Sequence, residues 1–168
     1  MANQQYHRMS LQVSVQEVIP QTHCYTFNFF VQVLLVSDNN MIYDYREVVG
    51  WNNHIEGGLF NLEQLFVPIN ITNTHWIFIC VQFKSKTIKI YDSFGSPNHH
   101  YQKYLWAMRS YLYDEEFKDV VPEAHPNFDN WKRTWKTQDK SRDSPRQENT
   151  YDCGLLTMIS IYLMYREV

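Results

Sequence analysis

Residues 75–83 (HWIFICVQF) restrict the fold more than any other stretch, because they are apolar on both faces. A strand of this kind is typical of the centre of a sheet that is covered on both sides. Lys84-Ser85-Lys86 can reverse the chain, and residues 87–92 (TIKIYD) then alternate between polar and apolar, as a half-buried strand does. The sequence therefore predicts an antiparallel hairpin inside a small sheet.

Three apolar patterns predict helices around this hairpin. Residues 25–36 carry apolar side chains at i, i+3, i+4, i+7 and i+8, which predicts a core-facing helix. Ser96-Pro97 is a helix start signal, and the residues after it place one apolar stripe on a helix. The stripe consists of Tyr101, Tyr104, Leu105, Met108 and Leu112. Residues 154–166 are apolar nearly all round, which predicts a buried helix.

Two further segments complete the expected architecture. A short strand is predicted around residues 65–71, ahead of the hairpin. Residues 118–150 are polar and interrupted by proline, which predicts one short strand and a long loop, with Trp131 and Trp135 as isolated anchors. The order of elements predicts an α+β fold, in which a small mixed sheet is packed by helices.

Composition excludes several classes of function. A length of 168 residues suits one domain, and a net charge of −3 argues against a nucleic-acid-binding protein. No apolar run approaches the roughly 18 residues of a membrane span, and the first residues have no secretory h-region. The three cysteines include no C-x-x-C pair, and His99-His100 would diverge by about 100° on a helix. We therefore expect an intracellular protein in a reducing compartment, with no metal and no cofactor.

Cys153 stands immediately before the last apolar stretch, which would place it at a helix N-terminus. There the helix dipole and the free N–H groups favour a negative charge, as a nucleophilic thiolate requires. His75 opens the central strand and Asp92 closes the next one, so an antiparallel hairpin would make them neighbours. Gln147, six residues before Cys153, could donate to an oxyanion together with the Cys153 backbone N–H.

Each of these residues alone also has a structural interpretation. A free cysteine is often a buried small hydrophobe, an aspartate can cap a turn, and a tryptophan such as Trp76 is commonly part of a core. We assign that structural role to Cys24 and Cys80. For Cys153, the combination with His75, Asp92 and Gln147 favours a nucleophile.

The chain resembles the Ulp/SENP family of ubiquitin-like-protein (SUMO) cysteine proteases, peptidase family C48, over about residues 22–166. The motifs that carry the resemblance are His75-Trp76, Tyr91-Asp92-Ser93 and Gln147-x-Asn149-x-x-Asp152-Cys153-Gly154. The family implies a papain-like cysteine protease fold in the adenain/Ulp arrangement, with the nucleophile at a helix N-terminus. It also implies that Cys153 is the nucleophile, His75 the general base and acid, and Asp92 the carboxylate that orients His75. Gln147 would contribute to the oxyanion hole, and Trp76 would line a narrow tunnel for the Gly-Gly tail.

The resemblance implies a peptidase or isopeptidase that cleaves after the Gly-Gly C-terminus of a ubiquitin-like modifier. SUMO and its conjugates are the expected partners, and the expected protein is a monomer in the nucleus or cytoplasm. Three alternatives stay open: specificity for NEDD8 or ubiquitin, a catalytically weakened domain that binds a ubiquitin-like protein, and an acyltransferase that uses the same triad.

The sequence departs from the family pattern in two places. Thr150 stands where the family usually has glycine, and a positive φ there would strain a threonine. The Trp-Leu-Asn/Ser-Asp-like stretch that usually begins the catalytic domain has no counterpart in residues 1–24. We therefore expect residues 1–168 to form a single Ulp-type protease domain that lacks the usual N-terminal part.

Overall fold

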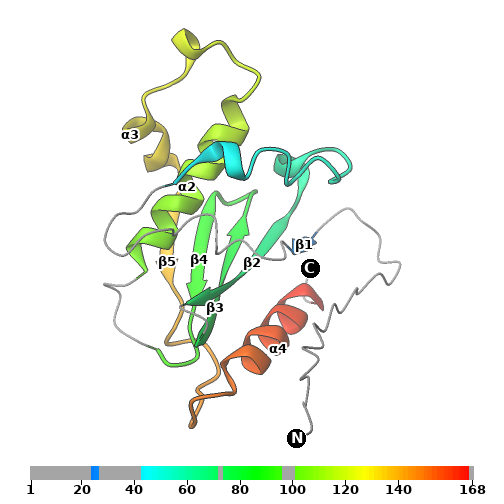
Figure 1. Ribbon diagram of the computed structural model, residues 1–168, viewed down its shortest axis with the longest axis vertical. Helices are drawn as coiled ribbons and strands as arrows, with labels where there is room; N and C mark the ends of the chain where they lie inside the picture. Colours follow the sequence, from blue (N-terminus) through cyan, green and yellow to red (C-terminus); the bar gives the residue numbers. More distant parts are fainter. Residues whose placement is uncertain (1–23, 27–42, 72–73, 96–100, 167–168) are drawn as a thin grey trace, which may run out of the picture.

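A five-stranded mixed sheet forms the centre of the molecule (Figure 1). The computed structural model describes residues 24–26, 43–71, 74–95 and 101–166. Within them the strands, in spatial order, are β1 (Cys24–Thr26), β2 (Gln64–Ile71), β3 (His75–Gln82), β4 (Thr87–Tyr91) and β5 (Lys136–Asp139). The pairs β2–β3 and β3–β4 are antiparallel, whereas β1–β2 and β4–β5 are parallel. The α+β class, the central hairpin and the strand near residues 65–71 are thus confirmed.

The two faces of the sheet pack against different helices. The helices are α2 (Gln102–Phe117), α3 (Phe128–Trp131) and α4 (Cys153–Arg166), and short 3-10 turns lie between the elements. Ile77 and Ile79 of β3 face the larger core, which α2 completes. Phe78 and Cys80, on the opposite face, pack in a smaller cluster with α4. This two-sided burial explains why the β3 sequence is apolar at nearly every position.

The helix after Ser96-Pro97 is confirmed, with its start displaced. The α2 helix begins at Gln102, and all five residues of the predicted stripe are buried. Ser96 and Pro97 themselves lie outside the described residues. The helix predicted over residues 25–36 is wrong at its first two positions, because Tyr25 and Thr26 belong to β1. The rest of that stretch also lies outside the described residues.

The prediction that the last helix is buried is wrong. Only Cys153 and Thr157 of α4 are buried, whereas Met158 is 64% and Tyr162 58% exposed. One side of α4 packs on β3, and the outer side of the helix faces away from the sheet. An all-round apolar pattern therefore indicates hydrophobicity here without indicating how many neighbours cover the helix.

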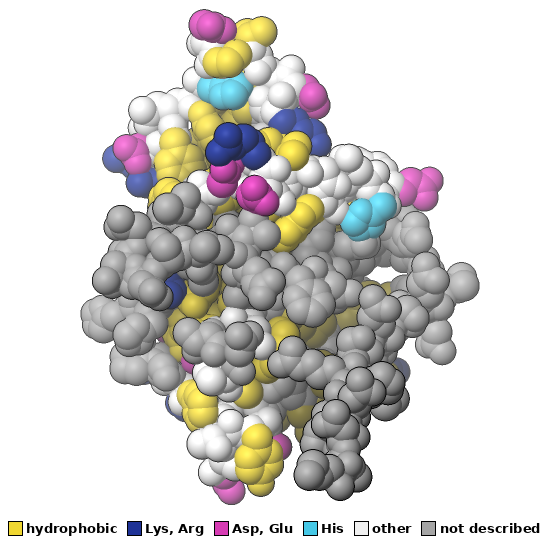
Figure 2. All heavy atoms as spheres, in the orientation of Figure 1, with side chains coloured by type: hydrophobic (Ala, Val, Ile, Leu, Met, Phe, Trp, Pro, Cys, Tyr) yellow, Lys and Arg dark blue, Asp and Glu magenta, His cyan; other side chains and the backbone are white. Residues whose placement is uncertain are grey.

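The polar stretch 118–150 contains more structure than its composition predicts. The expected short strand is β5, and α3 was missed even though Asn127 caps it by accepting from the N–H groups of Asp129 and Asn130. Trp131 and Trp135 are buried in the larger core, which confirms them as anchors. In Figure 2 both signs of charge are interspersed around α3 and the end of α2, as on a solvated surface.

Candidate active site

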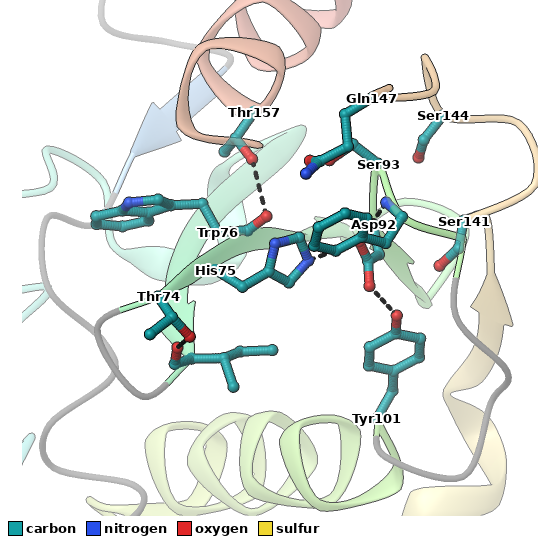
Figure 3. Close-up of polar contacts among 12 residues, drawn as sticks. Thr74, His75, Trp76, Asp92, Ser93, Tyr101, Ser141, Ser144, Gln147 and Thr157 are labelled. Atoms are coloured by element: carbon teal, nitrogen blue, oxygen red, sulfur yellow. Dashed lines mark hydrogen bonds and ion pairs between the residues drawn. The ribbon is translucent and has the colours of Figure 1, made fainter. Parts of the chain in front are cut away.

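His75 and Asp92 meet at one edge of the sheet. His75 is the first residue of β3, and Asp92 directly follows β4. The antiparallel register pairs Phe78 with Tyr91, which carries the end of β4 back toward the start of β3. His75 Nε2 lies 2.7 Å from Asp92 Oδ1 (Figure 3), and the two side chains are 14% and 3% exposed. The hairpin thus makes a direct contact from residues seventeen apart in the sequence.

The Asp92 carboxylate accepts three hydrogen bonds. Oδ1 accepts from His75 and from the backbone N–H of Phe94 at 2.8 Å, and Oδ2 accepts from the Tyr101 hydroxyl. These donors come from β3, from the loop after β4 and from the residue before α2, so both carboxylate oxygens are held. Sequence reasoning placed Tyr101 only in the apolar stripe of a helix, and no motif marked its hydroxyl as part of this cluster.

The other ring nitrogen of His75 is available for proton transfer. Since the carboxylate accepts from Nε2, the neutral imidazole carries its proton there and leaves Nδ1 as the base. Nδ1 is buried and has no hydrogen-bond partner among the described residues. The Phe94 ring covers the imidazole, with ring centroids 4.5 Å apart. This arrangement gives His75 one oriented nitrogen and one free nitrogen, as a general base requires.

Cys153 is the first residue of α4 and is 3% exposed. The α4 helix packs against β3, whose first residue is His75. A Cβ added to Gly154 would lie 3.3 Å from Trp76 Cδ1, so the residues adjacent to Cys153 and His75 touch. No hydrogen bond joins the Cys153 thiol to His75 within the part of the chain that the structure describes. Catalytic contacts are often longer in the absence of substrate.

Gln147 is fixed beside Asp92 by three hydrogen bonds. Its Oε1 accepts from Ser93 Oγ at 2.5 Å, its Nε2 donates to Asn149 O at 2.7 Å, and its backbone N–H donates to Ser93 O. These bonds assign the amide orientation and leave one N–H of the side chain uncommitted. That N–H is the kind of donor that an oxyanion hole needs.

The turn before Cys153 is built around Asn149. Its Oδ1 accepts from the N–H groups of Tyr151 and Asp152, and its Nδ2 donates to the Asp152 carboxylate. Among the described non-glycine residues only Lys86 has a positive φ, so Thr150 occupies an ordinary conformation. The strain considered for Thr150 is therefore absent, because the side chain of Asn149 forms the turn without a left-handed residue after it.

The described residues show neither a metal cluster nor a membrane-spanning helix. The described residues contain no group of three or more His, Cys, Asp or Glu side chains placed to hold a metal ion. His99 and His100 lie outside the described residues. Among the helices that the structure describes, none is both long and apolar enough to span a bilayer.

A protein-family model matches almost the whole chain. The model of the Ulp1 protease family, C-terminal catalytic domain, matches residues 3–168. Ubiquitin-like-specific protease 1 of Saccharomyces cerevisiae is 30% identical over 112 residues, which are 66% of this chain and 16% of that protein. A sentrin-specific protease of Caenorhabditis elegans is 30% identical over 133 residues, 79% of this chain and 16% of that protein. Ubiquitin-like-specific protease 1A of Arabidopsis thaliana is 29% identical over 134 residues. The chain thus spans about a quarter or less of the length of these three relatives.

Two solved structures have the same fold. The C-terminal Ulp1 protease domain in complex with Smt3, the yeast ortholog of SUMO, aligns with a TM-score of 0.59 and 26% identity. The alignment covers 83% of this chain and 56% of that one. The SUMO protease Ulp1 with its catalytic cysteine oxidised to a sulfonic acid aligns with a TM-score of 0.55 and 27% identity, over 70% of this chain and 49% of that one.

Proposed function

This chain belongs to the Ulp1 protease family, and from that membership we propose that it is a cysteine peptidase acting after the Gly-Gly C-terminus of a ubiquitin-like modifier. The observation that carries the proposal is the contact between His75 Nε2 and Asp92 Oδ1, which leaves the buried Nδ1 atom without a hydrogen-bond partner among the described residues. The start of α4, with Cys153 as its first residue, packs beside this pair through Gly154 and Trp76.

The proposed reaction proceeds through an acyl-enzyme. His75 Nδ1 takes the thiol proton, and the Cys153 sulfur attacks the carbonyl carbon of the terminal glycine. The resulting oxyanion accepts from the free N–H of Gln147 and from the Cys153 backbone N–H. His75 then gives its proton to the leaving amine, and a thioester remains on Cys153. Water, deprotonated by His75, hydrolyses the thioester and regenerates the thiol.

Trp76 is the proposed contact for the modifier's tail. It follows His75 in β3, is half-buried, and lies against the residue after Cys153. A glycine tail held between an indole and a helix start would be selected by size, because a larger side chain would collide with the ring. SUMO is the modifier we propose, since a related structure holds Smt3 and relatives are named for ubiquitin-like proteins and sentrin. We propose that this activity is exerted in the nucleus or cytoplasm.

The decisive experiment uses SUMO, NEDD8 and ubiquitin, each carrying a C-terminal electrophile. We expect a covalent adduct with SUMO that is seen by intact mass and is lost in Cys153→Ala. Cys80→Ala is the matched control: Cys80 is a buried cysteine of the smaller hydrophobic cluster, so its removal should leave adduct formation intact. Absence of an adduct with all three modifiers, or an adduct that survives in Cys153→Ala, would overturn the proposal.

A second candidate function is binding without turnover. It rests on the lack of a hydrogen bond between His75 Nδ1 and the Cys153 thiol among the described residues, because turnover requires that contact to form when substrate binds. It predicts that the protein binds a modifier in a calorimetric titration yet forms no adduct. Adduct formation that depends on both Cys153 and His75 would exclude this alternative.

A further inference from the structure

The second oxygen of Asp92 is held by a residue that the proposed mechanism does not use. Oδ1 faces His75, and Oδ2 accepts a hydrogen bond from the Tyr101 hydroxyl (Figure 3). Both Asp92 and Tyr101 are 3% exposed, so water cannot readily replace this bond. A carboxylate bound on one oxygen can turn about its terminal bond, whereas one bound on both oxygens has a fixed plane.

Tyr101 itself is held in place by the start of α2. It is the N-cap residue of that helix, and its carbonyl accepts from the N–H groups of Tyr104 and Leu105. Its ring is part of the larger hydrophobic core. The hydroxyl is therefore aimed at Asp92 by an element separate from the hairpin that carries His75.

We propose that Tyr101 is a positioning residue, which fixes the Asp92 carboxylate so that Oδ1 stays in line with His75 Nε2. The inference rests on the proposed function. Without the phenol, Oδ2 is a buried acceptor that receives no hydrogen bond from the described residues, and the carboxylate is free to turn toward other donors. The imidazole would then lose its fixed orientation toward the nucleophile, although no group touching the substrate had changed.

The phenol remains a donor over the working pH range. Burial, followed by the hydrogen bond to Asp92, raises the pKa of Tyr101 above its ordinary value. Asp139, at the end of β5, adds a smaller effect in the same direction. The side chain of Ser141, which follows β5 and points toward the Tyr101 hydroxyl in Figure 3, lowers this pKa, but by less than burial and Asp92 raise it. The protonated phenol is thus the form that faces Asp92.

The chain offers a matched control for Tyr101→Phe. Tyr104 lies three residues later on α2, is also 3% exposed, and belongs to the same core. No hydrogen bond joins Tyr104 to Asp92 among the described residues, and the pKa of Tyr104 is raised by burial alone. Tyr104→Phe also removes a phenol hydroxyl from the start of α2, but it leaves the Asp92 carboxylate with all its donors.

The first measurement is steady-state cleavage of a SUMO fusion. We expect Tyr101→Phe to lower kcat about tenfold with KM unchanged, since a lost hydrogen bond to a charged group has about this effect. Tyr104→Phe should match the wild type. In an Asp92→Ala background the Tyr101→Phe change should have no further effect on kcat, because its target is gone. A loss in Tyr101→Phe that persists unchanged without Asp92 would overturn the proposal.

The second measurement does not depend on protease activity. In protein labelled with 15N-histidine, the His75 Nε2–H signal is identified by its absence in His75→Gln. We expect Tyr101→Phe to speed exchange of this proton with water by about tenfold, and Tyr104→Phe to leave it unchanged. An unchanged signal in Tyr101→Phe, or equal changes in both variants, would refute the positioning role. A change confined to Tyr101→Phe in a protein that cleaves no modifier would retain the positioning role and reject the proposed function.

Discussion

The indole of Trp76 lies directly against Gly154, and a Cβ added at position 154 would be 3.3 Å from Trp76 Cδ1. The contact joins the residue after His75 in β3 to the residue after Cys153 in α4. A hydrogen bond from Thr157 Oγ1 to the Trp76 carbonyl, at 3.5 Å, lies on the same junction. The start of α4 and the start of β3 therefore meet through Gly154 and Trp76.

Gly154→Ala should separate stability from activity. Alanine stabilises a helix relative to glycine by up to about 1 kcal/mol, and this gain offsets the cost of the tight contact with Trp76. The variant should therefore unfold at nearly the wild-type temperature. Its methyl group must displace the indole by a few tenths of an ångström, and small misplacements near reacting groups are costly. We expect adduct formation with the SUMO electrophile to slow about tenfold. If the rate stays at the wild-type value with the fold intact, the contact does not control the site.

Ser93→Ala should weaken the oxyanion donor without touching the triad. Ser93 Oγ donates to Gln147 Oε1, and this bond specifies which end of the amide carries the donor. Without it the amide can turn over, so we expect kcat to fall about fivefold with KM unchanged. Ser144→Ala is the control, because that hydroxyl is also buried but donates to Lys140 O. Equal losses in the two serine variants would argue against a role for Ser93 in orienting Gln147.

The central part of the fold could be predicted from local pattern alone. The apolar run of β3, the turn at Lys84–Lys86 and the alternation of β4 specify a hairpin, and the hairpin brings His75 to Asp92. These relationships are local in sequence, because the geometry of an antiparallel strand pair determines which residues of the two strands lie side by side. The start of α4 at Cys153 follows in the same way from an apolar stretch after a turn.

Relationships between distant elements could not be predicted in this way. The Tyr101 hydroxyl reaches Asp92 only because α2 begins beside the end of β4, and the apolar stripe gives no sign of it. The exposure of Met158 and Tyr162 was missed because periodicity measures hydrophobicity and not the number of covering neighbours. Thr150 illustrates the opposite error, since a family preference for glycine suggested strain that the Asn149 turn avoids.

Asp114→Asn should raise stability at neutral pH. Burial, as the largest effect, raises the pKa of the Asp114 carboxyl above its ordinary value of 3.8, so the folded state holds the proton more tightly than the unfolded state. The stability of the folded state therefore falls as the pH rises above 3.8 and the carboxylate ionises. Below pH 3.8 the carboxyl is protonated in both states, and the folded state loses no stability. We expect a higher melting temperature than wild type at pH 7 and no difference near pH 3.

Asp129→Asn is the control with the opposite sign. The hydrogen bond from Lys132 lowers the pKa of this exposed carboxyl, so neutralising it should leave stability at pH 7 unchanged or slightly reduced. Thermal unfolding of both variants at the two pH values checks the pair. A neutral or destabilising Asp114→Asn at pH 7 would mean that burial does not dominate at that site.

The loop that follows Asp92 depends on Gly95. Its φ is +62°, and an added Cβ would fall 1.8 Å from Arg146 Nη1, which donates to Phe94 O at 2.7 Å. Phe94 in turn donates its N–H to Asp92 and covers the His75 ring. Gly95→Ala should cost about 1 kcal/mol or more in stability from backbone strain, and should lower kcat because the guanidinium is driven off the loop.

Two comparisons distinguish these effects. Arg146→Ala removes an exposed hydrogen bond and should lower kcat only slightly. The Gly95→Ala/Arg146→Ala double variant should have the same kcat as Gly95→Ala, because that single change has already displaced the guanidinium. Gly57, at φ +79°, is the matched site outside the loop, and Gly57→Ala should lose stability while keeping kcat. Chemical unfolding and cleavage assays on the four variants test both points. If the losses in kcat add in the double variant, the guanidinium of Arg146 is not the group that Gly95→Ala displaces. If Gly57→Ala also lowers kcat, the fall in kcat of Gly95→Ala comes from general destabilisation.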